Sequence, residues 1–551
     1  MSTWTVITWP PCSAAAREPA LLSPRAMSEI FDYLIAGGGT AGCVLANRLS
    51  ADPGVTVALI EAGPPDDDPA IQVPAMVAKV IGNPRQSWGY QTVPQRAVDN
   101  RVLPVPRGRV LGGCSSINGM VYFRGHPREY DEWQQPGWRY ADLAPYFERL
   151  ENYEAAHTPQ RHRGGPVNVI DIPHPNPLVR RFLAAADTLG LPRCADFNGG
   201  DPEGFGPRQA TIRHGRRESG VTAYLNPARR RPNLKIMTDA LVTRVVFDAR
   251  RATGIEIEQG GARRLVKARR EVIVACGAYG SPQLLQLSGV GDAAALQALG
   301  MAPTLDLPAV GKNLHDHPAA SIAVRTANTE SYGLSWRTVP RSVRIAAQYL
   351  LFRSGPLASN VFEANGFMRS RPEVDRPDLQ IIFMPAHRNA SGHWLPRGHG
   401  YGIIFVNLRP ISRGSVALTS NDPRDKPAID FNFLAAPADI EVLVRGFEVA
   451  RSLLAAPSFA PLRSVETSPG PAVRERTQIE AHIRKSLVTV HHPCGTCRLG
   501  DVVDTQLRVK GLEALRVVDA SVIPTVIAGN SNIPVTAVAE RAADLILGKI
   551  Q

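Results

Sequence analysis

The feature that most constrains this chain is a glycine-rich turn between two short apolar segments near its start. Residues 30–36 (IFDYLIA) are an apolar run, residues 43–50 carry apolar side chains at helical spacing, and a second apolar run over residues 55–60 ends at Glu61. The glycines of the turn, spaced GxGxxG, are Gly37, Gly39 and Gly42. This order predicts a βαβ unit in which amides at a helix N-terminus bind a pyrophosphate and the acid binds a ribose hydroxyl.

Two further apolar segments predict that the same sheet takes strands from distant parts of the chain. Residues 271–275 (EVIVA) precede a Gly-Ser-Pro turn, and residues 515–519 (LRVVD) lie near the C-terminus. Both have the length and the β-branched content of buried strands. The intervening stretches, about 130–205 and 310–480, have mixed patterns and more proline. We therefore expect an α/β fold with a second, interleaved domain.

Composition excludes several classes of protein. With 551 residues, 44% hydrophobic and 20% charged, the chain can bury a large core and is neither disordered nor a coiled coil. The net charge of +12 is spread along the sequence, and its densest clusters lack interleaved aromatic residues for base stacking. We expect no nucleic-acid partner. Seven cysteines, an odd number, do not make a disulfide framework, which favours a reducing, cytoplasmic location.

Membrane insertion is not expected, because no stretch reaches the ~18 consecutive apolar residues of a spanning helix. Residues 342–357 (SVRIAAQYLLFRSGPL) are apolar with interspersed arginines. An ordinary amphipathic helix accounts for this pattern. A weak peripheral contact with the inner membrane and a substrate entrance are the alternatives.

A second motif covers residues 106–122 (PRGRVLGGCSSINGMVY). Its small residues and dense backbone donors suit a loop that lies along a flat ring or a phosphate. A tight structural turn has a similar composition, so this segment alone does not decide between the two.

Taken together, five blocks make the chain resemble the glucose–methanol–choline (GMC) family of FAD-dependent oxidoreductases. In style it is similar to bacterial choline dehydrogenase-like and aliphatic alcohol dehydrogenases. The blocks, in family order, are GGGTAGCVLANRLS with IEAGP, PRGRVLGGCSSINGMVYFRGH, GAYGSPQLLQLSGVG, HHPCGTCRLG and VVDASVIPTVIAGNSNIP.

The resemblance implies FAD as cofactor and a Rossmann-like FAD-binding domain interleaved with a substrate domain built on an antiparallel sheet with helices. Ile117 stands where some members attach FAD covalently through histidine, so we expect noncovalent FAD. The implied cofactor-binding residues are Gly37, Gly39, Thr40, Ala41, Gly42, Glu61, Gly112, Asn118, Gly119, Met120, Val121, Val242, Asp519 and Ala520. The predicted FAD-binding domain covers residues 28–160, 205–310 and 480–551, the substrate domain 161–204 and 311–479, and a disordered extension 1–27.

The implied reaction is oxidation of a primary alcohol to an aldehyde. His492 would abstract the hydroxyl proton, with Asn532, where several relatives place a second histidine, as its partner at the substrate oxygen. A hydride would pass to flavin N5. The electron acceptor, a quinone or dye-type compound or O₂, is left open. An oxygen-using alcohol oxidase and a redox-silent hydroxynitrile lyase of the same family are the alternative functions.

Two further residues are candidates for contact with the substrate. Glu363 stands where choline-acting relatives keep a carboxylate, although a hydrogen-bonded structural role is an equal alternative, and His491 precedes the motif histidine. His315 and His317 are expected to be structural. The spacing His492-x-Cys494-x-x-Cys497 also permits a zinc site or a redox CxxC, but no second cysteine pair completes a zinc site, so we expect no metal.

Overall fold

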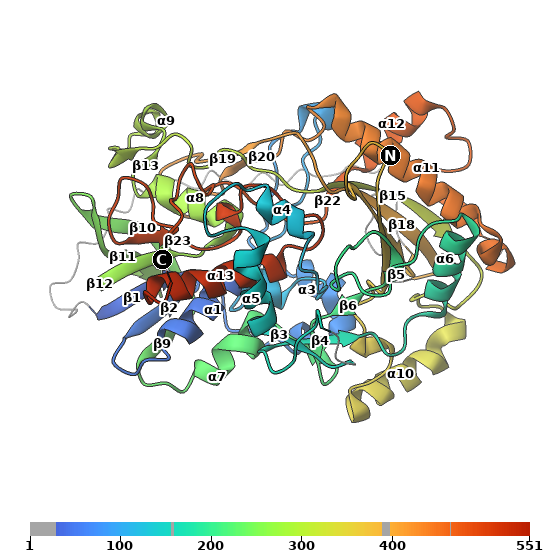
Figure 1. Ribbon diagram of the computed structural model, residues 1–551, viewed down its shortest axis with the longest axis horizontal. Helices are drawn as coiled ribbons and strands as arrows, with labels where there is room; N and C mark the ends of the chain where they lie inside the picture. Colours follow the sequence, from blue (N-terminus) through green and yellow to red (C-terminus); the bar gives the residue numbers. More distant parts are fainter. Residues whose placement is uncertain (1–28, 156–158, 388–396, 463, 551) are drawn as a thin grey trace, which may run out of the picture.

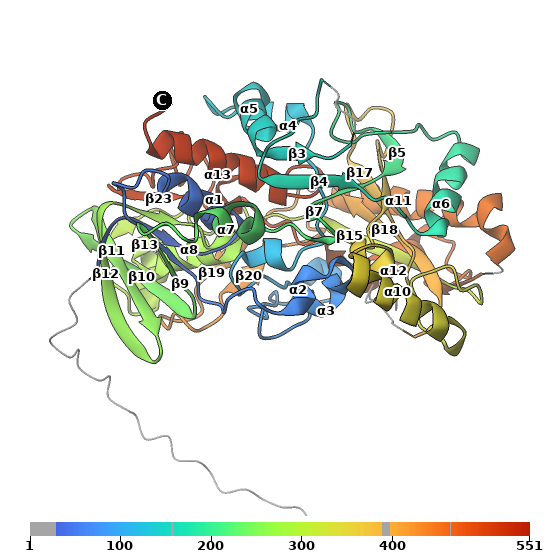
Figure 2. The same ribbon diagram turned by 90° about the horizontal axis from the view of Figure 1, so that it is seen from below.

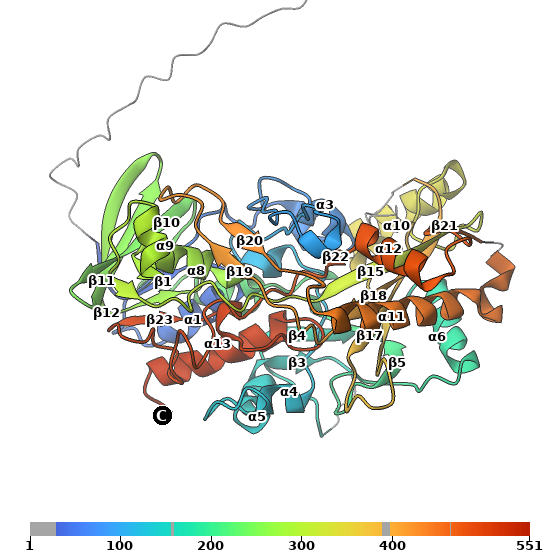
Figure 3. The same cartoon turned by 90° about the horizontal axis from the view of Figure 1, so that it is seen from above.

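The computed structural model describes residues 29–155, 159–387, 397–462 and 464–550. The disordered extension predicted over residues 1–27 lies outside the described residues. The described chain contains two seven-stranded sheets, which lie toward opposite ends of the long axis of the molecule (Figure 1). Views from below and from above show the same separation (Figures 2 and 3).

The first sheet is built around the predicted βαβ unit. Its strands, in the order β10-β11-β12-β1-β2-β9 with β23 beside β12, are β1 (Ile30–Ala36), β2 (Val57–Ile60), β9 (Leu234–Met237), β10 (Ala240–Asp248), β11 (Arg251–Gln259), β12 (Ala262–Val274) and β23 (Leu515–Val517). β1 is parallel to β2 and to β12, and β23 is parallel to β12. The sheet therefore takes strands from both ends and from the middle of the chain, as the apolar segments predict.

The inner strands of this sheet are buried because helices cover them. Leu34 and Ile35 of β1 are fully buried, as the continuous apolar run predicts for a parallel strand covered on both faces. Helix α1 (Thr40–Leu49) follows β1 and packs against α13 (Asn532–Ile546), the long C-terminal helix. α5 (Tyr140–Leu150) packs on α13, and α8 (Gly277–Leu287) packs on β10.

The second sheet is antiparallel. Its strands, in the order β21-β15-β18-β17-β16-β5 with β22 beside β15, are β5 (Gly204–Pro207), β15 (Pro318–Arg325), β16 (Ala364–Met368), β17 (Leu379–Met384), β18 (Gly400–Asn407), β21 (Val465–Ser468) and β22 (Val488–Thr489). Four helices of the described chain lie on the same side of the molecule as this sheet: α6 (Pro177–Thr188), α10 (Val339–Phe352), α11 (Pro437–Ala455) and α12 (Arg476–Ser486).

Alternate side chains of the central strands β17 and β18 enter two different apolar clusters. Phe405 packs edge-on against Phe447 of α11, with ring centroids 6.1 Å apart. Its neighbour Ile404 points to the opposite face, into a cluster that contains Phe123 and Phe367. The period of two thus covers one face with α11 and leaves the other for a functional site.

The predicted domain boundaries differ slightly from the extent of the sheets. β5 and β22 belong to the second sheet, although β5 straddles the predicted boundary and β22 lies within the C-terminal range expected for the FAD-binding domain. The division into two domains stays a prediction. Over the described ranges, no helix has both the length and the apolar character needed to cross a membrane.

Candidate active site

The glycine turn after β1 leaves open space beside its central residue. Gly37 has a φ of +108°, and a Cβ there would lie 2.4 Å from the carbonyl oxygen of Ala275. A Cβ on Gly42 would lie 2.0 Å from the carbonyl oxygen of Gly37, so both positions require glycine. A Cβ on Gly39 would meet no atom closer than 4.0 Å. This is the arrangement of a turn that a ligand approaches closely.

The N-terminus of α1 offers unused hydrogen-bond donors at this turn. Its N-cap residue is Gly39, which has no side chain to accept from the first-turn amides, and the first turn contains no acidic residue. The backbone N–H groups of Thr40 and Ala41 therefore point out of the helix with the positive end of the helix dipole. Such a donor set fits the pyrophosphate of FAD.

Glu61, at the end of β2, shapes the same turn. Its two carboxylate oxygens accept from the backbone N–H groups of Gly38 and Gly63, both at 2.9 Å. Burial raises the pKa of this carboxyl to about 7. The carbonyl of Glu61 accepts from the N–H of Ala240, which places the start of β10, and with it Val242, beside Glu61. Each carboxylate oxygen keeps a lone pair for the predicted ribose hydroxyl.

The second motif forms a loop that lies against the glycine turn. The N–H of Gly112 donates to the carbonyl of Gly38 over 2.7 Å. A Cβ on Gly113 would lie 2.8 Å from the Cα of Gly39, so the two backbones are in close contact. The two glycine-rich segments, far apart in the sequence, therefore line one cradle.

The end of this loop leads toward the second sheet. Oδ1 of Asn118 accepts from the N–H of Met120 and from the guanidinium of Arg217, both at 2.9 Å. Met120 is fully buried. A Cβ on Gly119 would lie 3.0 Å from the ring of Phe362, so a side chain there would require that ring to shift.

Asp519 joins the C-terminal segment to α8. Its carboxylate accepts from the N–H of Gly277 (2.8 Å), the hydroxyl of Ser281 (2.5 Å) and the N–H of Ser521 (2.7 Å). The carbonyl of Ala520 accepts from the N–H of Gly495. Because the carboxylate is used within the fold, the predicted contact of these two residues with FAD is left to their backbone.

The pairing of β15 with β22 brings two histidines together. Pro318 faces Thr489 in this antiparallel pair, so His317, just before β15, lies next to His492, just after β22. Their Nδ1 atoms are 3.1 Å apart. Asp316 supports both, because its Oδ1 accepts from the backbone N–H of His317 and of His492, each at 2.7 Å.

The other ring nitrogen of His492 faces Asn530, and Arg208 sets the direction of that hydrogen bond. Nε2 of His492 lies 3.0 Å from Nδ2 of Asn530, and the guanidinium of Arg208 donates to Oδ1 of the same amide over 3.0 Å. A guanidinium only donates, so Oδ1 must face Arg208 and Nδ2 must face the histidine. His492 therefore holds a lone pair at Nε2 and, when neutral, its proton at Nδ1, shared with His317.

The surroundings keep His492 neutral. Burial lowers its pKa well below 6.5, and His317, His491, Arg107 and Arg208 lower it further, because each adds positive charge or competes for the proton. A histidine that stays unprotonated at neutral pH can accept a proton from a bound hydroxyl group.

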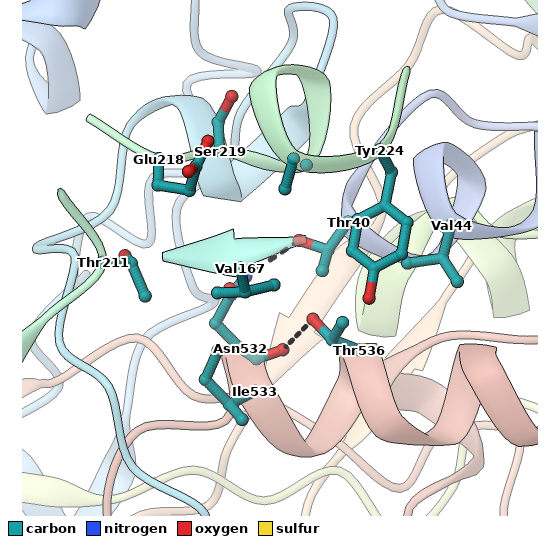
Figure 4. A pocket seen from close by; sticks show the side chains of 12 residues that line it. Thr40, Val44, Val167, Thr211, Glu218, Ser219, Tyr224, Asn532, Ile533 and Thr536 are labelled. Atoms are coloured by element: carbon teal, nitrogen blue, oxygen red, sulfur yellow. Dashed lines mark hydrogen bonds between the residues drawn. The ribbon is translucent and has the colours of Figure 1, made fainter. Parts of the chain in front are cut away.

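Asn530, and not the predicted Asn532, is hydrogen-bonded to His492 in the structure. Asn532 is the first residue of α13, and its Nδ2 donates to the hydroxyl of Thr40 over 2.9 Å, while its carbonyl accepts from Thr536 (Figure 4). It lines a pocket beside α1 (Figure 4). Asn530 lies before the helix begins, and the backbone there carries its side chain to His492 instead.

His491 has a different environment from its neighbour. Its φ of +70° is unusual for a residue with a side chain, and its carbonyl accepts from Arg107 over 2.9 Å. Burial, with Arg107 as a second cause, lowers the pKa of His491 to about 3. The strained backbone is a consequence of the turn that presents His492.

Glu363 is engaged within the second sheet. Its carboxylate accepts from the N–H of Asn176 (2.8 Å) and from the hydroxyls of Tyr332 (2.7 Å) and Ser359 (2.5 Å). Burial raises its pKa despite these bonds. This observation favours the structural role over the substrate contact.

Two groups of side chains in this region contain possible metal ligands: the cysteines of the CxxC segment, and a cluster of one aspartate with two histidines. Cys494 and Cys497 are buried, and burial raises the pKa of both thiols well above the usual value, which makes them poor ligands and poor nucleophiles. Donor atoms of Asp316, His317 and His492 do lie within 4.8 Å of one another. They are joined by hydrogen bonds, however, because the histidine nitrogens face each other and the carboxylate binds backbone amides and Thr489.

Three residues that contact His492 directly or through Asn530 are not indicated by the sequence. The sequence favours a structural role for His317 and indicates no role for Asn530 or Arg208. Asn530 stands in the segment GNSNIP, where two asparagines compete and only the start of α13 separates them. Arg208 has no motif around it, and the pairing of β5 with β16 places it in the site.

Two models of one family match the chain. The N-terminal model of the GMC oxidoreductases matches residues 31–319, and the C-terminal model of the same family matches residues 410–539. Among curated proteins, the chain is 42% identical to an alcohol dehydrogenase (acceptor) of Pseudomonas putida over 95% of this chain and 96% of that protein. It is 41% identical to an oxygen-dependent choline dehydrogenase of Sinorhizobium fredii, over 94% of this chain and 96% of that protein.

Solved structures have the same fold. Pyridoxine 4-oxidase from Mesorbium loti superposes with a TM-score of 0.83 and 32% identity, over 93% of this chain and 98% of that chain. A formate oxidase from Aspergillus oryzae RIB40 superposes with a TM-score of 0.88 and 28% identity, over 95% of this chain and 99% of that chain.

Proposed function

The chain belongs to the GMC oxidoreductase family and is an FAD-dependent oxidoreductase acting on CH–OH donors, and on that basis we propose that it oxidises a primary alcohol to an aldehyde with His492 as the base. The observation that supports this most strongly is the neutral imidazole whose Nε2 lone pair faces Asn530. Bound FAD supplies the acceptor for the hydride that leaves the carbinol carbon.

His492 handles the proton in this proposal. The bound alcohol would take the place of the hydrogen bond between Asn530 and His492, so that its hydroxyl donates its proton to Nε2 of His492 and its oxygen accepts a hydrogen bond from the released Nδ2 of Asn530. The alkoxide-like oxygen then favours departure of the C–H hydrogen with its electron pair. Asp316, whose carboxylate lies within 4.8 Å of donor atoms of both histidines, balances the positive charge that His492 gains.

Removal of the imidazole tests the role of the base. His492→Ala should retain FAD and lose about 10²–10⁴ in kcat, because general-base catalysis contributes that much. The assay mixes holoenzyme anaerobically with a panel of alcohols and follows loss of the visible absorbance of oxidised flavin. Bleaching by alcohols at an undiminished rate in the variant would remove His492 as base. If no alcohol bleaches the wild-type enzyme, a redox-silent lyase becomes the better proposal.

The electron acceptor is proposed to be a quinone or dye-type compound, with O₂ as the alternative. Support comes from the relatives, whose names include both an acceptor-dependent and an oxygen-dependent dehydrogenase. To distinguish the two acceptors, the flavin is first reduced anaerobically by alcohol, and its rate of reoxidation is then measured with O₂ and with a soluble quinone. Formation of peroxide would identify an oxidase.

A weak peripheral membrane contact is proposed at α10. Apart from Tyr349, its described side chains are exposed or half-buried, and the helix lies at the edge of the molecule in all three views (Figures 1–3). Trp336 is 82% exposed and Phe352 is 73% exposed. Exposed arginines at 337, 341 and 344 accompany these apolar side chains. Aromatic and aliphatic residues beside basic ones are typical of helices that bind an anionic lipid surface.

A further inference from the structure

A small pocket lies next to the catalytic pair, with Asn530 among its lining residues. It contains about 200 Å³ of atom-free space, part of which is open to solvent, and three of its lining side chains are phenylalanines. Its lining residues are Val121, Tyr122, Phe123, Phe197, Arg208, Gln209, Asn365, Phe367 and Asn530. Because Asn530 lines the pocket and also binds His492, a substrate whose hydroxyl reaches the base can extend into this space.

Arg208 brings a positive charge into this pocket without a counter-charge. It is 4% exposed, and within the described ranges no carboxylate oxygen comes within 4.0 Å of its guanidinium. Its side chain makes one hydrogen bond there, to Oδ1 of Asn530. Burial lowers the pKa of Arg208 to about 9. The neighbouring carboxylate of Glu363 is turned away, although the N–H of Arg208 donates to the Glu363 carbonyl.

Other buried arginines of this protein are compensated. Arg161 forms ion pairs with Glu151 and Asp196. Arg217, which also lacks a carboxylate partner, donates instead to four oxygens of the protein. A buried guanidinium with one neutral partner is costly, unless an anion completes its shell.

Asn365 adds a second donor to the same pocket. It lies on β16, is 1% exposed, and its Nδ2 has no hydrogen-bond partner among the described residues. The pairing of β16 with β5 places it beside the strand that ends at Arg208. Two unused donors thus converge in a pocket whose other walls are largely apolar.

We propose that the substrate is an alcohol that also carries a carboxylate, and that Arg208 and Asn365 bind this carboxylate. This proposal rests on the proposed alcohol oxidation and specifies its substrate. The guanidinium and the amide match the two oxygens of a carboxylate, and the phenylalanine rings surround a short carbon chain. Asn530 spans the distance between the guanidinium and the base, so hydroxyl and carboxylate are separated by a few carbons. The same positive charge disfavours a cationic alcohol such as choline.

The test compares 4-hydroxybutanoate, 1-butanol and choline as substrates of the FAD-loaded enzyme. Arg208→Gln should lower kcat/KM for 4-hydroxybutanoate about 30-fold or more, the loss expected when one partner of a buried charge pair is removed. The value for 1-butanol should fall by a much smaller factor, which reflects only the loss of the hydrogen bond by which Arg208 orients Asn530, and Arg208→Lys should restore part of the loss for 4-hydroxybutanoate. Arg369→Gln removes an exposed arginine and serves as the control for net charge.

Binding without turnover gives an independent measurement. Butanoate should raise the thermal stability of the wild-type holoenzyme and perturb its flavin spectrum, and both effects should be lost in Arg208→Gln. Asn365→Leu, which keeps the arginine, provides a second variant with the same expected direction if the first does not fold.

Equal losses for 4-hydroxybutanoate and 1-butanol in Arg208→Gln, or no binding of butanoate to the wild type, would overturn the proposal. The failure of the proposed function looks different: neither alcohol would reduce the flavin, although butanoate would still bind.

Discussion

Asn530 donates a hydrogen bond to Nε2 of His492 over 3.0 Å. The direction of this bond depends on Arg208, because a guanidinium occupies the oxygen end of the amide and leaves the nitrogen end for the histidine. The arginine therefore helps to hold the histidine as a hydrogen-bond acceptor. One amide connects the proposed anion pocket to the proposed base.

Replacement of Asn530 and of Asn532 by alanine, one at a time, separates the roles of the two residues. Asn530→Ala should lower kcat by about 10²–10³, the cost of removing one donor to the developing oxyanion. Asn532→Ala should leave kcat much closer to wild type, since its amide binds Thr40 and not His492. Stopped-flow reduction of the flavin measures both. A larger kcat loss in Asn532→Ala would restore the pairing that the sequence suggested.

The buried histidine cluster predicts acid sensitivity. Burial lowers the pKa of His317 to about 3, so the unfolded chain, with a histidine pKa of about 6.5, binds the proton first as pH falls. Stability is therefore lost between about pH 6.5 and pH 3, and one such group costs about 2 kcal/mol at pH 5. Urea unfolding of wild type and His317→Gln at pH 7 and pH 5 checks this. The difference in free energy of unfolding between wild type and His317→Gln should decrease by about 2 kcal/mol, in favour of the variant, from pH 7 to pH 5. A difference that is the same at both pH values would contradict the prediction.

A bulky residue at position 39 should remove the cofactor and not the fold. An added Cβ on Gly39 would meet no atom closer than 4.0 Å, so a side chain can start there without a clash, and in Gly39→Leu it would extend into the space proposed for the pyrophosphate. The purified variant should be colourless, with an unchanged circular dichroism spectrum. Fluorescence of FAD released by denaturation measures the loading. A fully loaded variant would exclude the glycine turn as the phosphate site.

Replacement of the apolar side chains of α10 and its N-terminal flank should weaken binding to anionic vesicles. Trp336→Ser, Leu351→Ser and Phe352→Ser together remove the most exposed of these side chains. Ile411→Ser with Val465→Ser, two exposed apolar residues elsewhere, is the matched control. Co-sedimentation with vesicles of anionic or zwitterionic phospholipid is the measurement. Absence of wild-type binding to either kind would exclude the contact.

The βαβ core of the first sheet could be predicted from the sequence because its signals are local, whereas β9, β10 and β11 of the same sheet were not predicted. Apolar runs, a GxGxxG turn and a terminal acid specify strand, turn and helix within some thirty residues. The predicted strand 30–36 coincides with β1. The antiparallel partners in the second sheet, by contrast, come from segments far apart in the chain, such as β5 and β16.

The sequence by itself indicated the glycine turn, its flanking strands and the acid that follows, because short-range backbone geometry specifies them, and the resemblance to the family indicated His492. Only the tertiary structure decided which asparagine meets His492, which histidine supports it, and that Arg208 lies beside both. Those choices depend on where α13 begins and on how β15, β22, β5 and β16 pair. If the pairing of any of these strands shifts by one residue, its side chains move to the opposite face of the sheet. No local pattern in the sequence specifies that pairing.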